Sequence, residues 1–361
     1  MRGPGQICQR EEHVIGHGGG FTSSVRCAAT ALLLTVLGQL SPALAEDTSV
    51  DNRSGSVRIY VSLATSAMTK LVTALNRHFP SLKIEFVRAG SVETVKRFVA
   101  ERQAGRIGTD LIHSADPGGF EYFAQRGWLD PRVSDAGLIK DYRDGFYDQK
   151  AGWVAMRATG IALMYNTNLV ARDALPKTWK DLLEPKWKSR VAISDPTRAG
   201  SSFSHLYAMW KTYGVDYLET FARNDVFVAG DGTATREAVA RGERDIAPVS
   251  EYDAFAFKKE GRPVDVAWLE DGTIMVPAPL ALVKGSPNSD NALALAQYLL
   301  SHEGQQITAD ITLSWSPRRD VQAPDGKPEL DSIKPATFDW DKAAAEKGQL
   351  LDLYFRYFQR R

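Results

Sequence analysis

The chain of 361 residues is poor in cysteine and contains only Cys8 and Cys27. Both cysteines precede the predicted cleavage point of an N-terminal signal peptide, so the mature chain would contain none. A chain without cysteine has no disulfide framework, no thiol nucleophile and no cysteine metal ligand. Composition therefore excludes a disulfide-stabilised scaffold and a cysteine enzyme.

The sequence also lacks an excess of charge of one sign. It has 44 Lys and Arg against 44 Asp and Glu, and beyond residue 45 the balance is 41 to 42. This balance gives no reason to expect a nucleic acid partner. No apolar run reaches the length of about 20 residues that a transmembrane helix requires. A membrane-spanning protein is therefore not expected.

Sequence motifs of common enzyme classes are missing as well. There is no G-x-S-x-G elbow, no H-E-x-x-H, no P-loop and no G-x-G-x-x-G. Beyond residue 45 the histidines are His78, His113, His205 and His302, which are far apart in the sequence. We therefore expect no catalysis and no cofactor. A serine triad assembled from distant residues, and hence a secreted hydrolase, is the alternative of another class.

The N-terminal segment matches a secretory signal peptide. Arg26 precedes an apolar run that starts at Ala28, and "SPALA" closes the run with a small-x-small pattern. We predict cleavage near Ala45, before Glu46, and export to the periplasm. Residues 1 to about 22 show no pattern, which indicates either a long leader or a start codon assigned too early.

The chain beyond residue 45 is longer than one hydrophobic core fills, so two lobes are expected. Its first part alternates strands and helices: strands at 57–63, 82–89 and 109–115, and helices at 67–79 and 92–105. This order predicts a parallel sheet with right-handed crossovers.

The alternation resumes farther along the chain. We expect strands at 160–166, 190–195 and 245–251, helices at 202–214 and 235–243, and then a return strand and an amphipathic helix. No linker rich in Pro, Gly or Ser separates these sections. Crossing strands are therefore expected to join the lobes.

Small hydroxyl residues follow three of the predicted strands, each at the start of a helix. The stretches are "SLATS" (62–66), "GSS" (200–202) and "DGTAT" (231–235). Each of them could simply cap its helix, because Ser, Thr and Asp are preferred N-caps. Three such helix starts at one edge of α/β units instead favour a site for phosphate, phosphonate or carboxylate.

Two further strand ends carry polar residues. One is "HSADP" (113–117), and the other is "SEYD" (250–253), where two carboxylates flank a phenol. Acidic residues at a helix start can favour the helix dipole, or one of them can meet a ligand ammonium or hydroxyl group. Arg157, just before the predicted strand at 160–166, could reach an anion in a cleft or form a salt bridge between the lobes.

Several stretches together resemble the periplasmic solute-binding proteins of ABC importers, in the cluster that includes ferric-ion, phosphonate, sugar-phosphate and spermidine-like binders. The resemblance covers nearly all of the predicted mature chain. Its most specific part is "W-x-D-L-L-x-P-x-W-K" followed by "D-P-x-x-x-G". The stretches that carry it are Ala158, Tyr165, Asn166 and Thr167 in "ATGIALMYNT", and residues 175–202, 238–249, 276–288, 296–306 and 314–321.

The resemblance implies an α/β fold of the two-lobed, type II Venus flytrap kind, with lobes joined by crossing strands. Residues 1–45 would be leader and signal peptide. The first lobe would comprise residues 46–157 and about 272–312, and the second about 158–271 with C-terminal helices in 313–361. Such a protein is expected to be a monomer that binds a small solute and delivers it to an ABC permease in the inner membrane.

The resemblance also bears on the ligand. Ferric-ion members use adjacent tyrosines where this chain has Tyr252 and Asp253, so one phenolate is missing, and the first-lobe loop has Ser62, Thr65 and Ser66 where a histidine would be expected. We therefore expect an organophosphonate or phosphate ester, such as 2-aminoethylphosphonate or a hexose phosphate, with ferric ion, bound through Tyr252, as the alternative. The candidate ligand residues are Ser62, Thr65, Ser66, Ser114, Asp116, Arg157, Thr197, Ser201, Ser202, Thr233, Glu251, Tyr252 and Asp253.

Overall fold

The computed structural model describes residues 50–359, so the predicted signal peptide and its cleavage point lie outside the described residues. In the first lobe, β1 (Gly55–Val61) pairs in parallel with β2 (Leu82–Arg88) on one side and β3 (Leu111–His113) on the other. The connecting helices are α1 (Thr65–His78) and α2 (Ser91–Gln103). The predicted parallel unit is confirmed.

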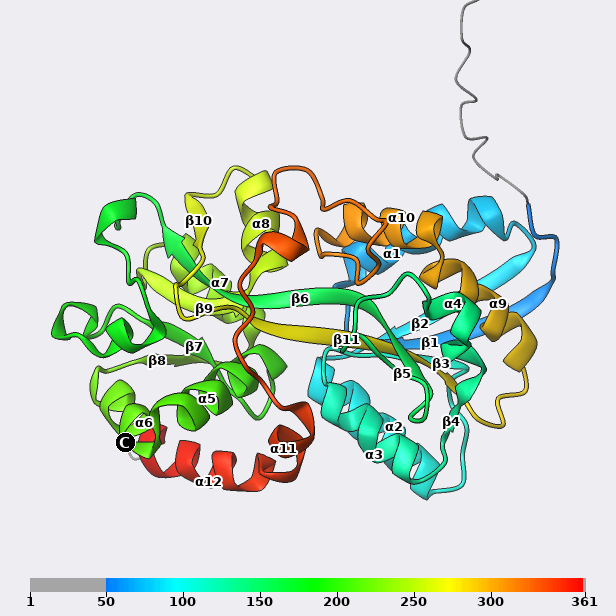
Figure 1. Cartoon of the computed structure of the whole chain (residues 1–361), viewed down its shortest axis with the longest axis horizontal. Helices are drawn as coiled ribbons and strands as arrows, with labels where there is room; N and C mark the ends of the chain where they lie inside the picture. The colour runs from blue at the N-terminus through cyan, green and yellow to red at the C-terminus, as the bar shows by residue number, and fades with distance from the viewer. Residues whose placement is uncertain (1–49, 360–361) are drawn as a thin grey trace, which may run out of the picture. The chain divides into compact units, whose positions relative to one another are not determined.

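The two lobes share a pair of long antiparallel strands (Figure 1). These are β6 (Trp153–Asn166) and β11 (Ile274–Val283), and every residue of β6 is buried. Strands buried on both faces carry continuous apolar runs instead of alternating ones. For this reason the prediction that the crossing strand begins at 160 was wrong, and Arg157 lies inside β6 instead of before it.

Within residues 50–359 the main sheet has nine strands, and β10, β6, β11, β3, β1 and β2 follow one another across it. The strand β9 (Ile246–Ser250) also pairs with β6, and β10 is Val264–Ala267. A separate parallel pair in the second lobe is formed by β7 (Ala192–Ser194) and β8 (Phe227–Ala229). Two short strands, β4 (Leu129–Asp130) and β5 (Tyr147–Asp148), pair with β11 and β6.

The remaining helices cover the two lobes. The expected helices at 202–214 and 235–243 are α5 (Gly200–Tyr213) and α7 (Gly232–Ala240), and the amphipathic C-terminal part is divided into α9 (Ser289–Leu300) and α10 (His302–Thr312). Helices that the sequence did not indicate are α3 (Pro117–Gln125), α4 (Ala136–Ile139) and α6 (Val215–Arg223). The helix α8 (Glu251–Lys259) begins at "SEYD", where a helix start was one of two interpretations. Short 3₁₀ turns occur at Pro131–Ser134, Arg172–Ala174, Trp179–Leu183, Pro185–Trp187 and Leu330–Ser332.

Each lobe has its own hydrophobic core. The C-terminal helices α11 (Trp340–Ala345) and α12 (Lys347–Phe358) bury Ala343, Leu350 and Tyr354 in the core of the second lobe. In the first lobe, α9 packs with α1 against the sheet. The predicted lobe boundaries at 157/158 and 271/272 stay predictions, since the first falls inside the continuous strand β6 and the second lies just before β11.

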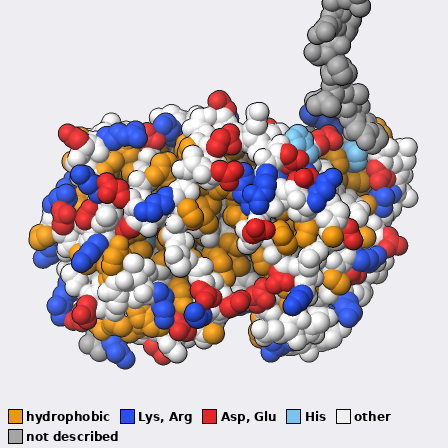
Figure 2. Space-filling view, in the orientation of Figure 1, with side chains coloured by type: hydrophobic (Ala, Val, Ile, Leu, Met, Phe, Trp, Pro, Cys, Tyr) orange, Lys and Arg blue, Asp and Glu red, His pale blue; other side chains and the backbone are white. Residues whose placement is uncertain are grey.

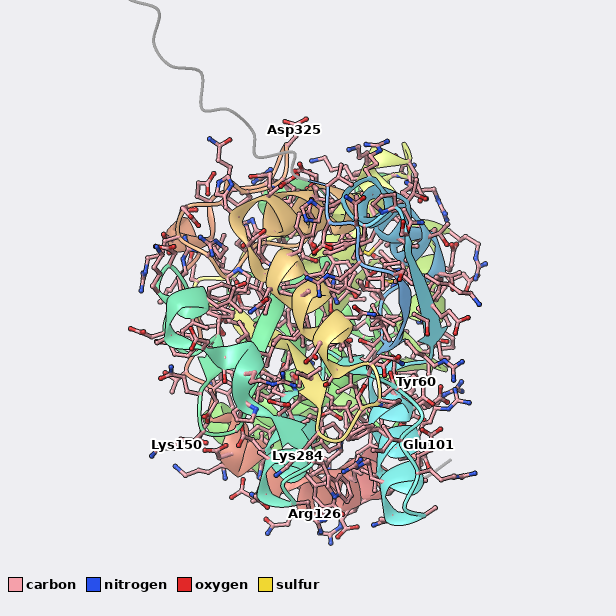
Figure 3. The ribbon with its side chains drawn as sticks, turned by 90° about the vertical axis from the view of Figure 1, so that its right-hand side faces the viewer. Tyr60, Glu101, Arg126, Lys150, Lys284 and Asp325 are labelled. Atoms are coloured by element: carbon pink, nitrogen blue, oxygen red, sulfur yellow. The ribbon has the colours of Figure 1, made fainter. Side chains whose placement is uncertain are left out.

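Figure 3 looks onto the first lobe, where the labelled Tyr60 and Glu101 lie close together. The Tyr60 hydroxyl donates to the Glu101 carboxylate over 2.9 Å and ties β1 to α2. Within residues 50–359, no helix is both long and apolar enough to span a membrane. The surface seen in Figure 2 mixes Lys and Arg with Asp and Glu, as the balanced composition predicts.

Candidate functional site

A polar cavity of about 240 Å³ lies between the lobes. The first lobe contributes the ends of β1, β2 and β3, and the second contributes the segments before α5, α7 and α8. Its lining residues are Ser62, Arg88, Gly90, Ser91, Glu93, Ala115, Arg198, Ala199, Gly200, Ser201, Asp231, Gly232, Thr233, Arg236, Ser250, Tyr252 and Asp253. A larger hollow between α3 and α11 is lined by many apolar side chains and lacks this convergence of polar groups.

Four of the described helices begin at this cavity. They are α2, α5, α7 and α8, whose first residues or N-caps are among its lining. The first N–H groups of a helix have no partner within the helix, and the helix dipole adds positive partial charge there. Several helix starts around one small space place N–H donors and positive partial charge where an anion would be favoured.

The N-cap residues of α1, α5 and α7 show whether the hydroxyl stretches at these helix starts cap their helices. At α1 and α5 the N-cap residues are Ala64 and Ala199, whose side chains have no oxygen that could accept a hydrogen bond. At α7 the Asp231 carboxylate does cap the helix and accepts from Ala234 N over 2.9 Å. The capping interpretation is therefore confirmed at α7, and it is wrong at α1 and α5.

Three guanidinium groups line the cavity, and they differ in their partners. Arg236 forms an ion pair with Asp253, with 2.7 Å between nitrogen and oxygen. Arg88, at the end of β2, and Arg198, in the turn before α5, have no ion-pair partner among residues 50–359. These two cations come from opposite lobes, so both are available to a ligand held between them.

Tyr252 and Asp253 lie on the first turn of α8. Burial is the main cause that raises the pKa of the Tyr252 phenol, and Asp253 adds to it. Burial likewise raises the pKa of Asp253 against the lowering effect of Arg236. The Arg157 guanidinium lies 5.0 Å from the centre of the Tyr252 ring. The phenol of Tyr252, which is among the lining residues, is therefore protonated at neutral pH.

Arg157 is buried beneath the cavity instead of lining it. It donates to Ser314 Oγ over 2.9 Å and to His113 Nε2 over 3.4 Å. Burial and the neighbouring Arg157 lower the pKa of His113 to about 3, so this histidine is neutral. His113 Nδ1 is 2.9 Å from the Pro279 carbonyl oxygen.

The structure brings five of the predicted ligand residues together at the cavity. They are Ser62, Ser201, Thr233, Tyr252 and Asp253. Ser62 comes from the first lobe, where its Oγ accepts from Ala115 N over 3.2 Å.

The other predicted residues lie outside this lining. Thr65 and Ser66 are exposed on α1. Ser114 is buried and donates to Ser91 O over 3.0 Å, and Asp116 is 3.4 Å from Lys347 Nζ. Arg157 has been described above, and Glu251 is buried below the cavity, with contacts described later.

Two predicted residues on the loop and first turn of α5 are also outside the lining. Thr197 donates its hydroxyl to Asp195 Oδ1 over 2.7 Å and shapes the turn. Ser202 is buried, and its Oγ has no hydrogen-bond partner in the described part of the chain.

Sequence reasoning missed part of the lining, notably Arg88, Gly90, Ser91, Glu93 and Arg236. The first four could have been found, because "RAGSVE" (88–93) joins the end of a predicted strand to the start of a predicted helix, as the three hydroxyl stretches do. Arg236 sits inside α7 and had no comparable signal.

A profile of the family described as bacterial extracellular solute-binding protein matches residues 109–346. The chain belongs to this family. Members deliver small solutes to ABC permeases, and membership in an extracellular family implies a periplasmic location. The resemblance found in the sequence is confirmed.

Individual relatives and structures agree with this assignment. A putative 2-aminoethylphosphonate-binding periplasmic protein of Salmonella typhi is 23% identical over 278 residues, which cover 73% of this chain and 79% of the relative. The fructose-6-phosphate-bound periplasmic binding protein AfuA of Actinobacillus pleuropneumoniae superposes with a TM-score of 0.74 at 20% identity, covering 86% of this chain and all of that one. Iron-bound HitA of Pseudomonas aeruginosa superposes with a TM-score of 0.74 at 18% identity, covering 84% of this chain and 99% of HitA. The two-lobed periplasmic-binding-protein fold is confirmed.

Proposed function

We propose that this member of the family captures a small anionic phosphorus compound between its lobes, either an organophosphonate such as 2-aminoethylphosphonate or a phosphate ester such as a hexose phosphate, and that it has no catalytic activity. The observation that carries the proposal is the convergence at one small cavity of four helix N-termini and two guanidinium groups without ion-pair partners, all within the described residues.

A phosphoryl group fits this arrangement of donors. Its three oxygens can accept several hydrogen bonds at once, from backbone N–H groups, from Ser201 and Thr233, and from the planar forks of Arg88 and Arg198. The carboxylates of Glu93 and Asp231 line the same cavity and could meet an ammonium or hydroxyl group at the other end of the solute. Cations and anions in one site of this size favour a zwitterion or a polyol phosphate.

Two of the three similarities described above support the same class, and the third, iron-bound HitA, supports the ferric-ion alternative. One relative is named for 2-aminoethylphosphonate and one structural neighbour for bound fructose 6-phosphate. The delivery of the solute to an inner-membrane permease, the signal peptide and the monomeric state are parts of the same proposal.

Isothermal titration calorimetry with 2-aminoethylphosphonate, fructose 6-phosphate, inorganic phosphate and ferric citrate tests the proposal. Each of Arg88→Ala and Arg198→Ala should weaken binding of the preferred phosphorus compound by about 10- to 100-fold, because a hydrogen bond to a charged group contributes about 1.5–3 kcal/mol. Arg106→Ala is the matched control, since Arg106 is exposed and lies outside the cavity. Unchanged affinity in both cavity variants would refute the assignment.

Ferric ion is the second candidate because Tyr252 shares the cavity with the carboxylates of Glu93, Asp231 and Asp253. Phenolate and carboxylate oxygens are hard donors that suit Fe(III). This candidate predicts a visible phenolate absorption band on addition of ferric citrate, and its loss in Tyr252→Phe. A band together with no heat from any phosphorus compound would replace our proposal.

A secreted hydrolase is disfavoured by the position of the histidines. None is among the residues that line the described cavity, and His113 and His205 are fully buried. A serine nucleophile usually requires a neighbouring base. Turnover of an ester panel that is abolished by Ser201→Ala would restore the hydrolase alternative.

A further inference from the structure

Beneath the cavity, two oppositely charged side chains are buried together. Glu251 and Lys327 are 0% and 1% exposed, and 2.7 Å separates Oε1 from Nζ. Burying an ion pair carries a large desolvation penalty and often adds no net stability. Such a pair therefore suggests a role beyond stabilising the fold.

Glu251 joins three parts of the molecule. It is the first residue of α8, and its neighbours Tyr252 and Asp253 line the cavity. Its Oε2 accepts a hydrogen bond from Gly160 N in the crossing strand β6 over 2.6 Å, while its Oε1 accepts from Lys327. Both carboxylate oxygens are therefore engaged inside the protein, so Glu251 holds its helix instead of meeting the solute.

Gly160 lies at a tightly packed point of the crossing strand. A Cβ atom there would be 2.6 Å from Thr273 Cγ2 and 3.3 Å from the Trp315 ring. The residue has no space for a side chain, so its backbone N–H is held in place for Glu251. The first turn of α8 is thereby fastened to the strand that connects the lobes.

Lys327 extends this connection to the segment that leaves α10. Its Nζ also donates to Leu313 O over 2.8 Å and lies 3.7 Å from the centre of the Trp315 ring. Trp315 forms two backbone hydrogen bonds with Ala158 in β6, of 2.8 and 3.1 Å. The turn that carries the labelled Asp325 lies at the top of Figure 3 and precedes Lys327 in the chain.

We propose that Glu251 and Lys327 are positioning residues for the solute cavity, which couple the first turn of α8 to the crossing strand and to the end of α10. The pair keeps Tyr252 and Asp253 in place relative to the first lobe when the lobes move. The expected effect on solute binding rests on the proposed function. The positioning of α8 rests only on the contacts described above.

The variants separate positioning from stability. Lys327→Met leaves a buried carboxylate without its partner and is expected to lower the melting temperature. The double variant Glu251→Gln with Lys327→Met removes both charges and should restore the melting temperature. The ion pair between positions 251 and 327 stays absent in this variant. Lys342→Met is the matched control, because Lys342 pairs with Asp339 on the exposed surface of the same C-terminal region.

The first measurement needs no ligand. Hydrogen exchange of the amides of residues 255–257, which donate to the carbonyl groups of the first turn of α8, should be at least 10-fold faster in the double variant than in the wild type, with the control unchanged. Equal protection in the double variant and the wild type would overturn the inference.

The second measurement is the affinity for 2-aminoethylphosphonate and fructose 6-phosphate. The double variant should bind about 10-fold more weakly, with a smaller ligand-induced change in the distance between fluorophores on the two lobes. Wild-type affinity and closure in a stable double variant would also overturn the inference. If the wild type binds neither compound, the proposed function fails, and the exchange of the α8 amides alone decides the positioning role.

Discussion

The lobes approach each other closely at Gly200, and Gly200→Ala should hold them apart. Gly200 is the first residue of α5 in the second lobe, and both of its close neighbours belong to the first lobe. A Cβ at this position would lie 3.0 Å from Ala115 O and 3.2 Å from Ser91 Oγ, whereas ordinary contacts begin near 3.4 Å. Ser91 can rotate its hydroxyl group away, but the Ala115 carbonyl belongs to the backbone and cannot.

The size of the effect follows from this contact. The lobes would have to separate by a few tenths of an ångström, and overpacking of this kind costs about 1–3 kcal/mol. The penalty applies only to the state in which the lobes meet, so solute affinity should fall by roughly 5- to 150-fold. Within the second lobe alone, alanine is a better helix former than glycine by up to about 1 kcal/mol, so the melting temperature should not fall.

Calorimetric titration with 2-aminoethylphosphonate and small-angle scattering with and without it would measure affinity and closure in the same samples. Gly348→Ala is the matched control: Gly348 also lies in a helix, α12, and a Cβ there meets nothing within 4 Å. Gly200→Val should enlarge the loss. The reasoning would be refuted if Gly200→Ala bound and closed like the wild type.

Three further predictions concern buried or paired side chains. Burial lowers the pKa of His205 to about 3 from 6.5, so the unfolded chain takes up the proton first, and stability is full above about pH 6.5 and falls below it. The loss of stability should reach about 2 kcal/mol at about pH 5. In denaturant titrations, the stability of His205→Leu should depend less steeply on pH than that of the wild type. An equal pH dependence in both proteins would contradict the role of His205. Asp231→Ala removes the cap of α7 and should lower the free energy of unfolding by about 1 kcal/mol, measured by scanning calorimetry. An unchanged free energy of unfolding would argue against the cap. Asp253→Asn frees Arg236 from its ion pair and should tighten binding of inorganic phosphate about 10-fold, and weaker binding would count against an anion site.

Most of the secondary structure was accessible from local patterns. Apolar residues recur every two residues in the strands β1, β2 and β3 and every three to four residues in the helices between them. These spacings can be recognised from neighbouring positions alone. The start of β6 was misplaced because a strand buried on both faces does not alternate. For α8 only a possible helix start at 250–253 was predicted, since the apolar residues of this helix form a weak face between charged ones.

The candidate site was predicted in part for a related reason. Ser201, Thr233 and Tyr252 stand next to recognisable strand ends, so their place at the sheet edge follows from the order of elements. The exit at Gly90 and Ser91 obeys the same rule and was overlooked. Ser114 has the same local pattern as Ser62, but its hydroxyl is taken by Ser91 O.

The family, the alternation of strands and helices, and the hydroxyl-rich helix starts could be predicted from sequence, because these features depend on residues close together in the chain. Which polar groups line the cavity and which hold the scaffold depends on contacts between residues far apart in the chain. Glu251 meets partners 91 and 76 residues away, at Gly160 and Lys327. Contacts over such separations arise from the packing of the lobes around the crossing strands, and no local pattern encodes them.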